Sequence, residues 1–117
     1  MKSQLHTKVF SLLREIYPYQ IIKEEKTIKL VNGKNLFVDI YIPALDLMVE
    51  CDGIQHFEYT PRFHKDKWDF YGQKMRDERK ELWCQDNNIS LVRFAYWEEK
   101  LLTKEYVADK VSLEISS

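Results

Sequence analysis

The stretch LFVDIYIPALDLMVECDGIQH, residues 36–56, decides the expected fold. Apolar side chains occupy every second position over residues 36–42 and Pro43 follows them, so this segment predicts a strand that ends at the proline. Residues 45–51 predict a second strand, in which the near-continuous apolar run Leu47-Met48-Val49 indicates burial on both faces. Only a short connection through Pro43 separates the two strands, so we expect a hairpin.

The segments before this hairpin predict a helix followed by short strands. Residues 3–17 carry apolar side chains at helical spacing, and Ser3 is a candidate N-cap. Residues 19–31 are rich in Tyr, Ile, Thr and Lys, which predicts one or two short strands. The dipeptide Asn32-Gly33 is a turn signal that leads into the next strand.

The segments after the hairpin predict a loop, a long helix, a strand and a helical end. Residues 52–63 lack periodicity and predict a loop, whereas residues 64–87 predict a long charged helix. Residues 89–95 predict a third clear strand, and residues 97–112 predict one or two short helices. The candidate inner positions of the long helix are Trp68, Tyr71, Met75, Leu82 and Trp83. This order of elements predicts an α/β or α+β fold with a mixed sheet.

The composition fits one domain spanning residues 1–117. The 18 Lys and Arg residues against 19 Asp and Glu give a net charge of −1, which excludes binding of nucleic acid by bulk charge but allows a local basic surface. No apolar run approaches the roughly 20 residues that span a bilayer, and no signal-peptide core opens the chain. We therefore expect no membrane partner and a cytoplasmic location, with Cys51 and Cys84 as reduced core thiols.

Acidic side chains stand at unusual places in the two strands of residues 36–56. Asp39 lies inside an apolar strand, and Glu50 and Asp52 lie where the next apolar run ends. A buried carboxylate costs several kcal/mol unless it is compensated, and a divalent cation with oxygen ligands compensates a cluster of them. His56 follows closely and is a suitable general base. The alternative is that Asp39 faces solvent on an edge strand and that Asp52-Gly53 is only a turn.

Three segments of the chain resemble a known enzyme family. The segments VDIYIP (38–43) and VECDGIQH (49–56) resemble the core of the PD-(D/E)XK nucleases, in the branch near the very-short-patch-repair endonucleases, the related phage homing endonucleases and the small DUF559-type nucleases. The segment KMRDERKELWCQDNNISLVRFAYWE (74–98) continues the resemblance with an Arg-Asp pair on a helix and a later strand carrying Arg, Trp and Glu. The resemblance implies a restriction-endonuclease-like α/β fold, with a mixed central sheet flanked by helices.

The resemblance also implies a metal site. Asp39 would be the principal metal ligand, with Glu50 at the acidic position of the second half-motif. Asp52 stands where the broader family has lysine, and it is a further candidate ligand. The implied cofactor is Mg²⁺, for which Mn²⁺ can substitute. We expect no zinc, because the Cys positions of the structural zinc site of the repair enzymes are absent.

The catalytic set implied by the resemblance is of the Glu-Asp-His-Asp type. His56 would replace the missing lysine as the group that activates water, and Asp77 would support the histidine or the metal site. Glu15 is the candidate for a glutamate on the first helix. Residues 62–68 interleave basic and aromatic side chains, which suits contacts with phosphates and a stacking ring. The candidate DNA-binding residues are Gln55, Arg62, Lys65, Lys67, Trp68 and Arg76. For the rings of Trp68 and Tyr71 we favour a place in the core of the long helix.

These residues together predict a metal-dependent endonuclease that hydrolyses phosphodiester bonds in double-stranded DNA. The small size and near-neutral charge favour the catalytic domain of a homing or repair-like nuclease whose DNA-recognition region lies outside this chain. One alternative is a catalytically silent nuclease-fold module that binds nucleic acid or protein. Another alternative is a resolvase of the same fold that prefers four-way junctions.

Overall fold

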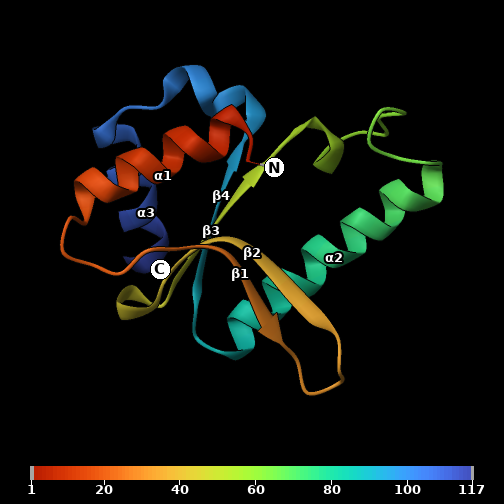
Figure 1. The fold of residues 1–117 in the computed structure, drawn as a ribbon, viewed down its shortest axis with the longest axis horizontal. Coiled ribbons are helices and arrows are strands. Elements are labelled where there is room, and N and C mark those ends of the chain that lie inside the picture. Colours follow the sequence, from red (N-terminus) through yellow and green to blue (C-terminus); the bar gives the residue numbers. More distant parts are fainter. Residues whose placement is uncertain (1, 117) are drawn as a thin grey trace.

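The computed structural model describes residues 2–116 and contains a four-stranded mixed sheet with helices on both faces (Figure 1). The strands are β1 (Lys23–Lys29), β2 (Asn35–Ile42), β3 (Leu47–Asp52) and β4 (Ser90–Ala95). The helices are α1 (Gln4–Ile16), α2 (Lys67–Asp86) and α3 (Lys104–Ser116). Short 3₁₀ helices, η1 (Pro43–Leu45), η2 (Ile54–His56) and η3 (Tyr96–Leu101), lie in the connections.

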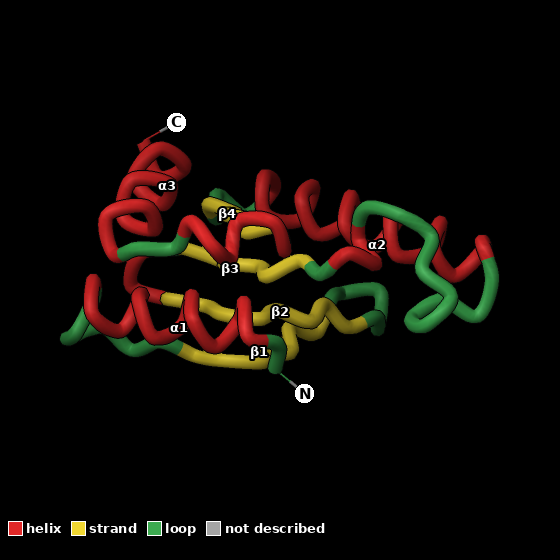
Figure 2. Tube along the Cα trace, turned by 90° about the horizontal axis from the view of Figure 1, so that it is seen from above, coloured by secondary structure: helices red, strands yellow, loops and turns green. Residues whose placement is uncertain are grey.

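The strands lie side by side in chain order from β1 to β4 (Figure 2). β1, β2 and β3 are antiparallel neighbours, whereas β4 runs parallel to β3. A parallel neighbour requires a crossover connection, and α2 supplies it. The mixed sheet and the hairpin around Pro43 are confirmed, and the predicted ends of the strands are correct within a few residues. The loop expected at 52–63 contains the short helix η2.

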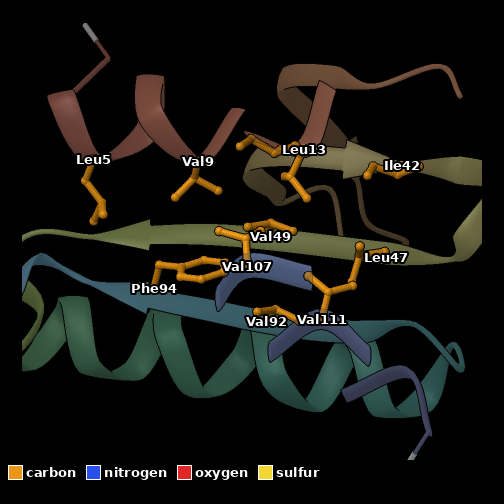
Figure 3. Packing of buried hydrophobic residues seen from close by; sticks show 11 residues of the cluster. Leu5, Val9, Leu13, Ile42, Leu47, Val49, Val92, Phe94, Val107 and Val111 are labelled. Carbon is orange, nitrogen blue, oxygen red and sulfur yellow. The ribbon is translucent and has the colours of Figure 1, made fainter. Parts of the chain in front are cut away.

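The sheet separates two clusters of buried side chains. α1 and α3 pack on one face and form the larger cluster with β2, β3 and β4. In Figure 3, Leu5, Val9 and Leu13 of α1 lie against β3, while α2 lies on the other side of the sheet. These three residues are spaced by four and therefore form one stripe of the helix. Ser3 caps α1 by accepting the N–H of His6 at 3.1 Å, as its N-cap position predicts.

The predicted inner face of α2 is wrong. Trp68, Tyr71, Met75 and Leu82 are 79%, 54%, 61% and 59% exposed, so the large side chains of α2 point mainly to the outside. The physical reason is that α2 turns polar side chains toward the sheet, where they join the site described below. The helix meets the smaller cluster mainly near its C-terminus, through Cys84 and Trp83.

The two cysteines are free thiols with different environments. Cys84 is buried, with Sγ 3.6 Å from the Sδ of Met48, whereas Cys51 is only partly buried. The core position expected for Cys84 is therefore confirmed, and Cys51 lies at the margin of the larger cluster. No helix within residues 2–116 combines the length and the apolar character needed to cross a bilayer.

Candidate active site

Asp39 and Glu50 lie where the main-chain pairing between β2 and β3 ends. The register pairs Ile40 with Val49, which places Asp39 opposite Glu50 at the next position. The Asp39 N–H donates to Oε2 of Glu50 at 2.8 Å, and the Cys51 N–H donates to Oδ2 of Asp39 at 2.8 Å. Side-chain carboxylates thus accept N–H groups at this end of the strand pair, and the main-chain pairing of the two strands stops at Ile40–Val49.

The strand on the other side of β2 is also irregular at this position. Glu25 of β1 lies opposite Asp39, and its backbone has a φ of 49°, in the left-handed region that non-glycine residues avoid. Val38, before Asp39, packs in the smaller cluster, whereas Ile40, after it, packs in the larger cluster. The residues on either side of Asp39 therefore pack in different clusters, and Asp39 itself is partly exposed.

Glu50 is a buried carboxylate paired with a cation from α2. It is 3% exposed, and it forms an ion pair with Lys80, whose ammonium contacts Oε1. Burial, together with the nearby charge of Asp39, raises the pKa of Glu50 to about 7, although Lys80 opposes the shift. Glu50 therefore changes its charge near neutral pH, and Lys80 favours the charged form.

A second group of polar side chains surrounds His56. Nδ1 of His56 lies 3.0 Å from Oδ2 of Asp77 and 3.7 Å from Oδ1 of Asp52. Burial disfavours the imidazolium, but the hydrogen bond to Asp77 and the charges of both aspartates outweigh it, so the pKa of His56 is raised. With Nδ1 donating to Asp77, the neutral ring has its free lone pair on Nε2. The Gln73 amide nitrogen lies 3.4 Å from both ring nitrogens.

Arg93 of β4 joins the acidic residues of β3 and α2. Its guanidinium lies 3.2 Å from Oδ2 of Asp52 and donates to the Asp77 carbonyl at 3.1 Å. It also contacts Glu81 at 3.3 Å, and it is the residue that β4 pairs with Glu50. Burial and Asp77 raise the pKa of Asp52, although His56 and Arg93 oppose the shift. Arg93 thus compensates carboxylates that would otherwise repel one another.

The set of oxygen ligands fits Mg²⁺ only in a form with few protein ligands. No group of three or more His, Cys, Asp or Glu side chains that could hold a metal ion occurs within residues 2–116. Mg²⁺ commonly takes one or two carboxylates and completes its shell with water and phosphate. Asp39 fits this role because its bond to Cys51 uses only Oδ2, and Glu50 lies directly opposite. Asp52 lies instead with Arg93 and His56.

The structure brings together most of the predicted catalytic residues but not Glu15. In Figure 3, α1 runs from Leu5, beside the end of β3, to Leu13, towards Leu47 at its start. Glu15 follows Leu13 and is exposed, so it lies toward the opposite end of β3 from Asp52. His6, in the first turn of α1, is buried, and its Nε2 lies 2.9 Å from Oε2 of Glu24.

The predicted DNA-binding residues are mostly exposed near the start of α2. Gln55 is the exception, because it is partly buried and its side-chain amide folds over Gly53, where a Cβ would collide with it. The exposed side chains, in the loop before α2 and on the first half of that helix, are those of Arg62, Lys65, Lys67, Trp68 and Arg76. None of these five belongs to the polar contacts around His56.

Three residues of the site have no role that the sequence predicted, namely Gln73, Lys80 and Arg93. Gln73, Asp77, Lys80 and Cys84 repeat at intervals of four, three and four, which places them on one face of α2. This spacing was the available signal, but the apolar residues of the opposite face hid it. Arg93 belonged to the resemblance and lies at the strand position next to Glu50, which only the register reveals.

Three curated viral proteins are similar to this chain. Uncharacterized protein 307L of Invertebrate iridescent virus 6 is 43% identical over 76 residues, which are 64% of this chain and 39% of that protein. Uncharacterized protein 033L of Invertebrate iridescent virus 3 is 35% identical over 66 residues, 56% of this chain and 34% of that protein. Uncharacterized protein 094L of Frog virus 3 is 32% identical over 79 residues, 67% of this chain and 51% of that protein.

The chain therefore matches about half or less of the length of each of these relatives. Their descriptions assign no activity to them, so they lend none to this chain. No protein-family model matches the sequence. No solved structure matches it.

Proposed function

We propose that this chain is a metal-dependent DNA endonuclease domain with a restriction-endonuclease-like fold. The observation that carries the proposal is that two groups of polar side chains lie near the end of β3, where its pairing with β2 has stopped. One is the carboxylate pair of Asp39 and Glu50, and the other is the His56–Asp77 pair. The groups are neighbours along two elements, because Glu50 and Asp52 are two residues apart on β3 and Asp77 and Lys80 are three residues apart on α2. Lys80 pairs with Glu50 in the first group, and Arg93 pairs with Asp52 and Asp77 beside His56 in the second.

In the proposed reaction, His56 accepts a proton from the attacking water at Nε2. Asp77 is a positioning residue, because its carboxylate accepts the Nδ1 proton and stabilises the imidazolium that forms. Asp39, with Glu50, would hold Mg²⁺, which supplies Lewis-acid stabilisation of the phosphate charge when bound. Lys80 places a positive charge at Glu50, although the broader family's lysine position is occupied here by Asp52.

In this proposal the DNA contacts come from exposed cations between the loop before α2 and the middle of that helix. Arg62, Lys65, Lys67 and Arg76 are exposed there and can contact phosphates, while Trp68 offers an exposed ring. The partner in this proposal is double-stranded DNA, with sequence recognition supplied by a region outside the chain. A homing or repair-like nuclease is the type of protein that fits such a domain.

A binding module without catalysis is the second candidate. It is favoured by the hydrogen bonds within the carboxylate pair, where Glu50 already contacts both Lys80 and the Asp39 N–H. Such internal pairing compensates the charges without a metal. Metal-induced stabilisation distinguishes the candidates, because only a metal-binding enzyme gains thermal stability from Mg²⁺ or Mn²⁺.

Nicking of supercoiled plasmid tests the proposed enzyme. We expect nicking in Mg²⁺ or Mn²⁺ and its loss in EDTA. We expect Asp39→Asn and His56→Ala to lower the rate by about 10²- to 10⁴-fold, because they remove the metal ligand and the general base. Asp86→Asn, an exposed acid at the end of α2, is the matched control. Wild-type protein that neither nicks nor gains stability from metal would exclude the enzyme and leave the binding module.

A further inference from the structure

Three aromatic side chains gather beside the candidate site and remain partly outside the core. Phe57 directly follows His56, while Tyr96 and Trp97 directly follow β4. The register pairs Asp52 with Ala95, so both segments leave the same end of the sheet (Figure 1). The three rings are 38%, 41% and 52% exposed. We call Phe57, Tyr96 and Trp97 the ring cluster.

The rings of this cluster touch each other at an angle and leave faces open. The ring centroids of Phe57 and Trp97 lie 4.6 Å apart at an interplanar angle of 54°, and those of Tyr96 and Trp97 lie 5.2 Å apart at 78°. Phe57 and Tyr96 are also tilted, at 5.9 Å and 56°. Tilted rings do not cover each other's faces as parallel stacked rings would. A planar ligand can therefore stack on an outer face.

One cation, Lys74, lies beside the ring cluster, and one exposed acid, Glu58, directly follows Phe57. The Lys74 ammonium lies 5.6 Å from the Phe57 ring centroid and 5.6 Å from that of Phe70. The acidic residues that follow Trp97 are both paired, since Glu98 contacts Lys110 at 2.7 Å and Glu99 contacts Lys8 at 3.8 Å. A cation beside open aromatic faces matches the phosphates and bases of a nucleic-acid strand.

We propose that the ring cluster stacks an unpaired base of single-stranded DNA beside the phosphate held at the candidate site. This inference rests on the proposed function and specifies its substrate as DNA with unpaired bases next to the cut. Bases inside a duplex already stack on their neighbours, so only a strand end, a flap or a junction offers a free face. Stacking tolerates every base, which gives structure preference without sequence preference.

The test measures the binding of fluorescently labelled DNA by anisotropy in EDTA, so that no substrate is cut. The probes are a short single strand, a blunt duplex and the same duplex with a single-stranded flap. We expect the wild type to bind the single strand and the flap more tightly than the blunt duplex. Trp97→Ala and Tyr96→Ala should weaken binding of the single strand by about 5-fold to 150-fold each, because a stack is lost.

Conservative and remote variants control for folding. Trp97→Phe keeps a ring and should retain most of the affinity, while Tyr19→Ala removes a ring that is 96% exposed after α1 and should change nothing. Thermal melting checks that each variant is folded. Equal affinity of wild type and Trp97→Ala for the single strand overturns the proposal, as does a wild type without preference for unpaired DNA. Tighter binding of an RNA strand of the same sequence overturns the assignment to DNA.

The outcomes separate this proposal from the nuclease. Strand binding that depends on Trp97, with neither cleavage of the flap duplex in Mg²⁺ or Mn²⁺ nor stabilisation by the metal, supports the ring cluster and contradicts the enzyme. Nicking with strand binding unchanged in Trp97→Ala contradicts the ring cluster and supports the enzyme.

Discussion

His56 and Asp77 form the pair from which the residue-scale chemistry follows. Because Asp77 is ionised and accepts from Nδ1, it stabilises the imidazolium and raises the pKa of His56 against the effect of burial. The same pairing lowers the pKa of Asp77, although burial acts in the opposite direction. The two residues therefore support each other's charge, and Asp52 adds to the effect on the ring.

The substitution Asp77→Asn should lower the pKa of His56. The asparagine oxygen can still accept the Nδ1 proton, but it carries no charge to favour the imidazolium. NMR titration of the histidine ring protons measures the pKa directly and requires no enzymatic activity. Asp86→Asn is again the matched control, since Asp86 is exposed at the far end of α2. An unchanged His56 pKa in Asp77→Asn would show that the pair does not form in solution.

Glu50 makes the stability of the fold depend on pH. Its pKa of about 7 in the folded protein lies above the ordinary value of 4.5, so the folded chain holds a proton that the unfolded chain releases. The contribution of protonated Glu50 to the free energy of unfolding should therefore be complete below about pH 4.5. It should fall by up to about 3 kcal/mol as the pH rises to 7.

Urea unfolding between pH 4.5 and 8 measures this dependence. Glu50→Gln cannot ionise, so its free energy of unfolding should vary less over the same range. His56 contributes in the same direction above about pH 6.5, because its pKa is also raised, and that part should persist in Glu50→Gln. Identical pH profiles for the two proteins would contradict the raised pKa of Glu50.

At the scale of elements, α1 buries its stripe of apolar side chains, whereas α2 leaves most of its large apolar side chains exposed. Leu13 of α1 is fully buried, and Leu13→Ala should lower the free energy of unfolding by about 2–5 kcal/mol. Leu82 of α2 is 59% exposed, and Leu82→Ala should change it by less than about 0.5 kcal/mol. Urea unfolding of both variants makes the comparison with one type of substitution. A large loss for Leu82→Ala would mean that the outer face of α2 is covered in solution.

The same contrast explains which elements could be predicted from the sequence. The strands around Pro43 follow from alternation and a proline, which act locally, and the end of β3 brings Glu50 and Asp52 next to β4. The inner face of α2 could not be predicted from hydrophobicity, because it carries the charged side chains of Asp77 and Lys80. These side chains pair with His56 and Glu50. The burial of His6 depends on Glu24 from β1, a long-range contact that local sequence does not contain.

At the scale of the whole molecule, charge decides how DNA can be bound. The net charge of −1 provides no general attraction to phosphates, so the proposed DNA binding would rely on exposed cations between the loop before α2 and the middle of that helix, namely Arg62, Lys65, Lys67 and Arg76. If each cation contacts one phosphate of duplex DNA, the logarithm of the affinity should fall with the logarithm of salt concentration with a slope of about 3 to 4. A protein with a strongly basic surface would show a larger slope.

Single substitutions should reduce this slope in steps. Lys65→Ala and Lys67→Ala should each lower its magnitude by about 0.9, because one fewer counterion is released from the duplex. Lys34→Ala, in the turn between β1 and β2, should leave the slope unchanged, since Figure 1 places that turn away from the start of α2. Anisotropy titrations of blunt duplex at several salt concentrations in EDTA give the slopes. If Lys34→Ala lowered the slope as much as Lys65→Ala, the DNA would lie across the sheet rather than along the start of α2. The DNA would then not be placed for cleavage at the candidate site, which lies where the pairing of β2 and β3 ends.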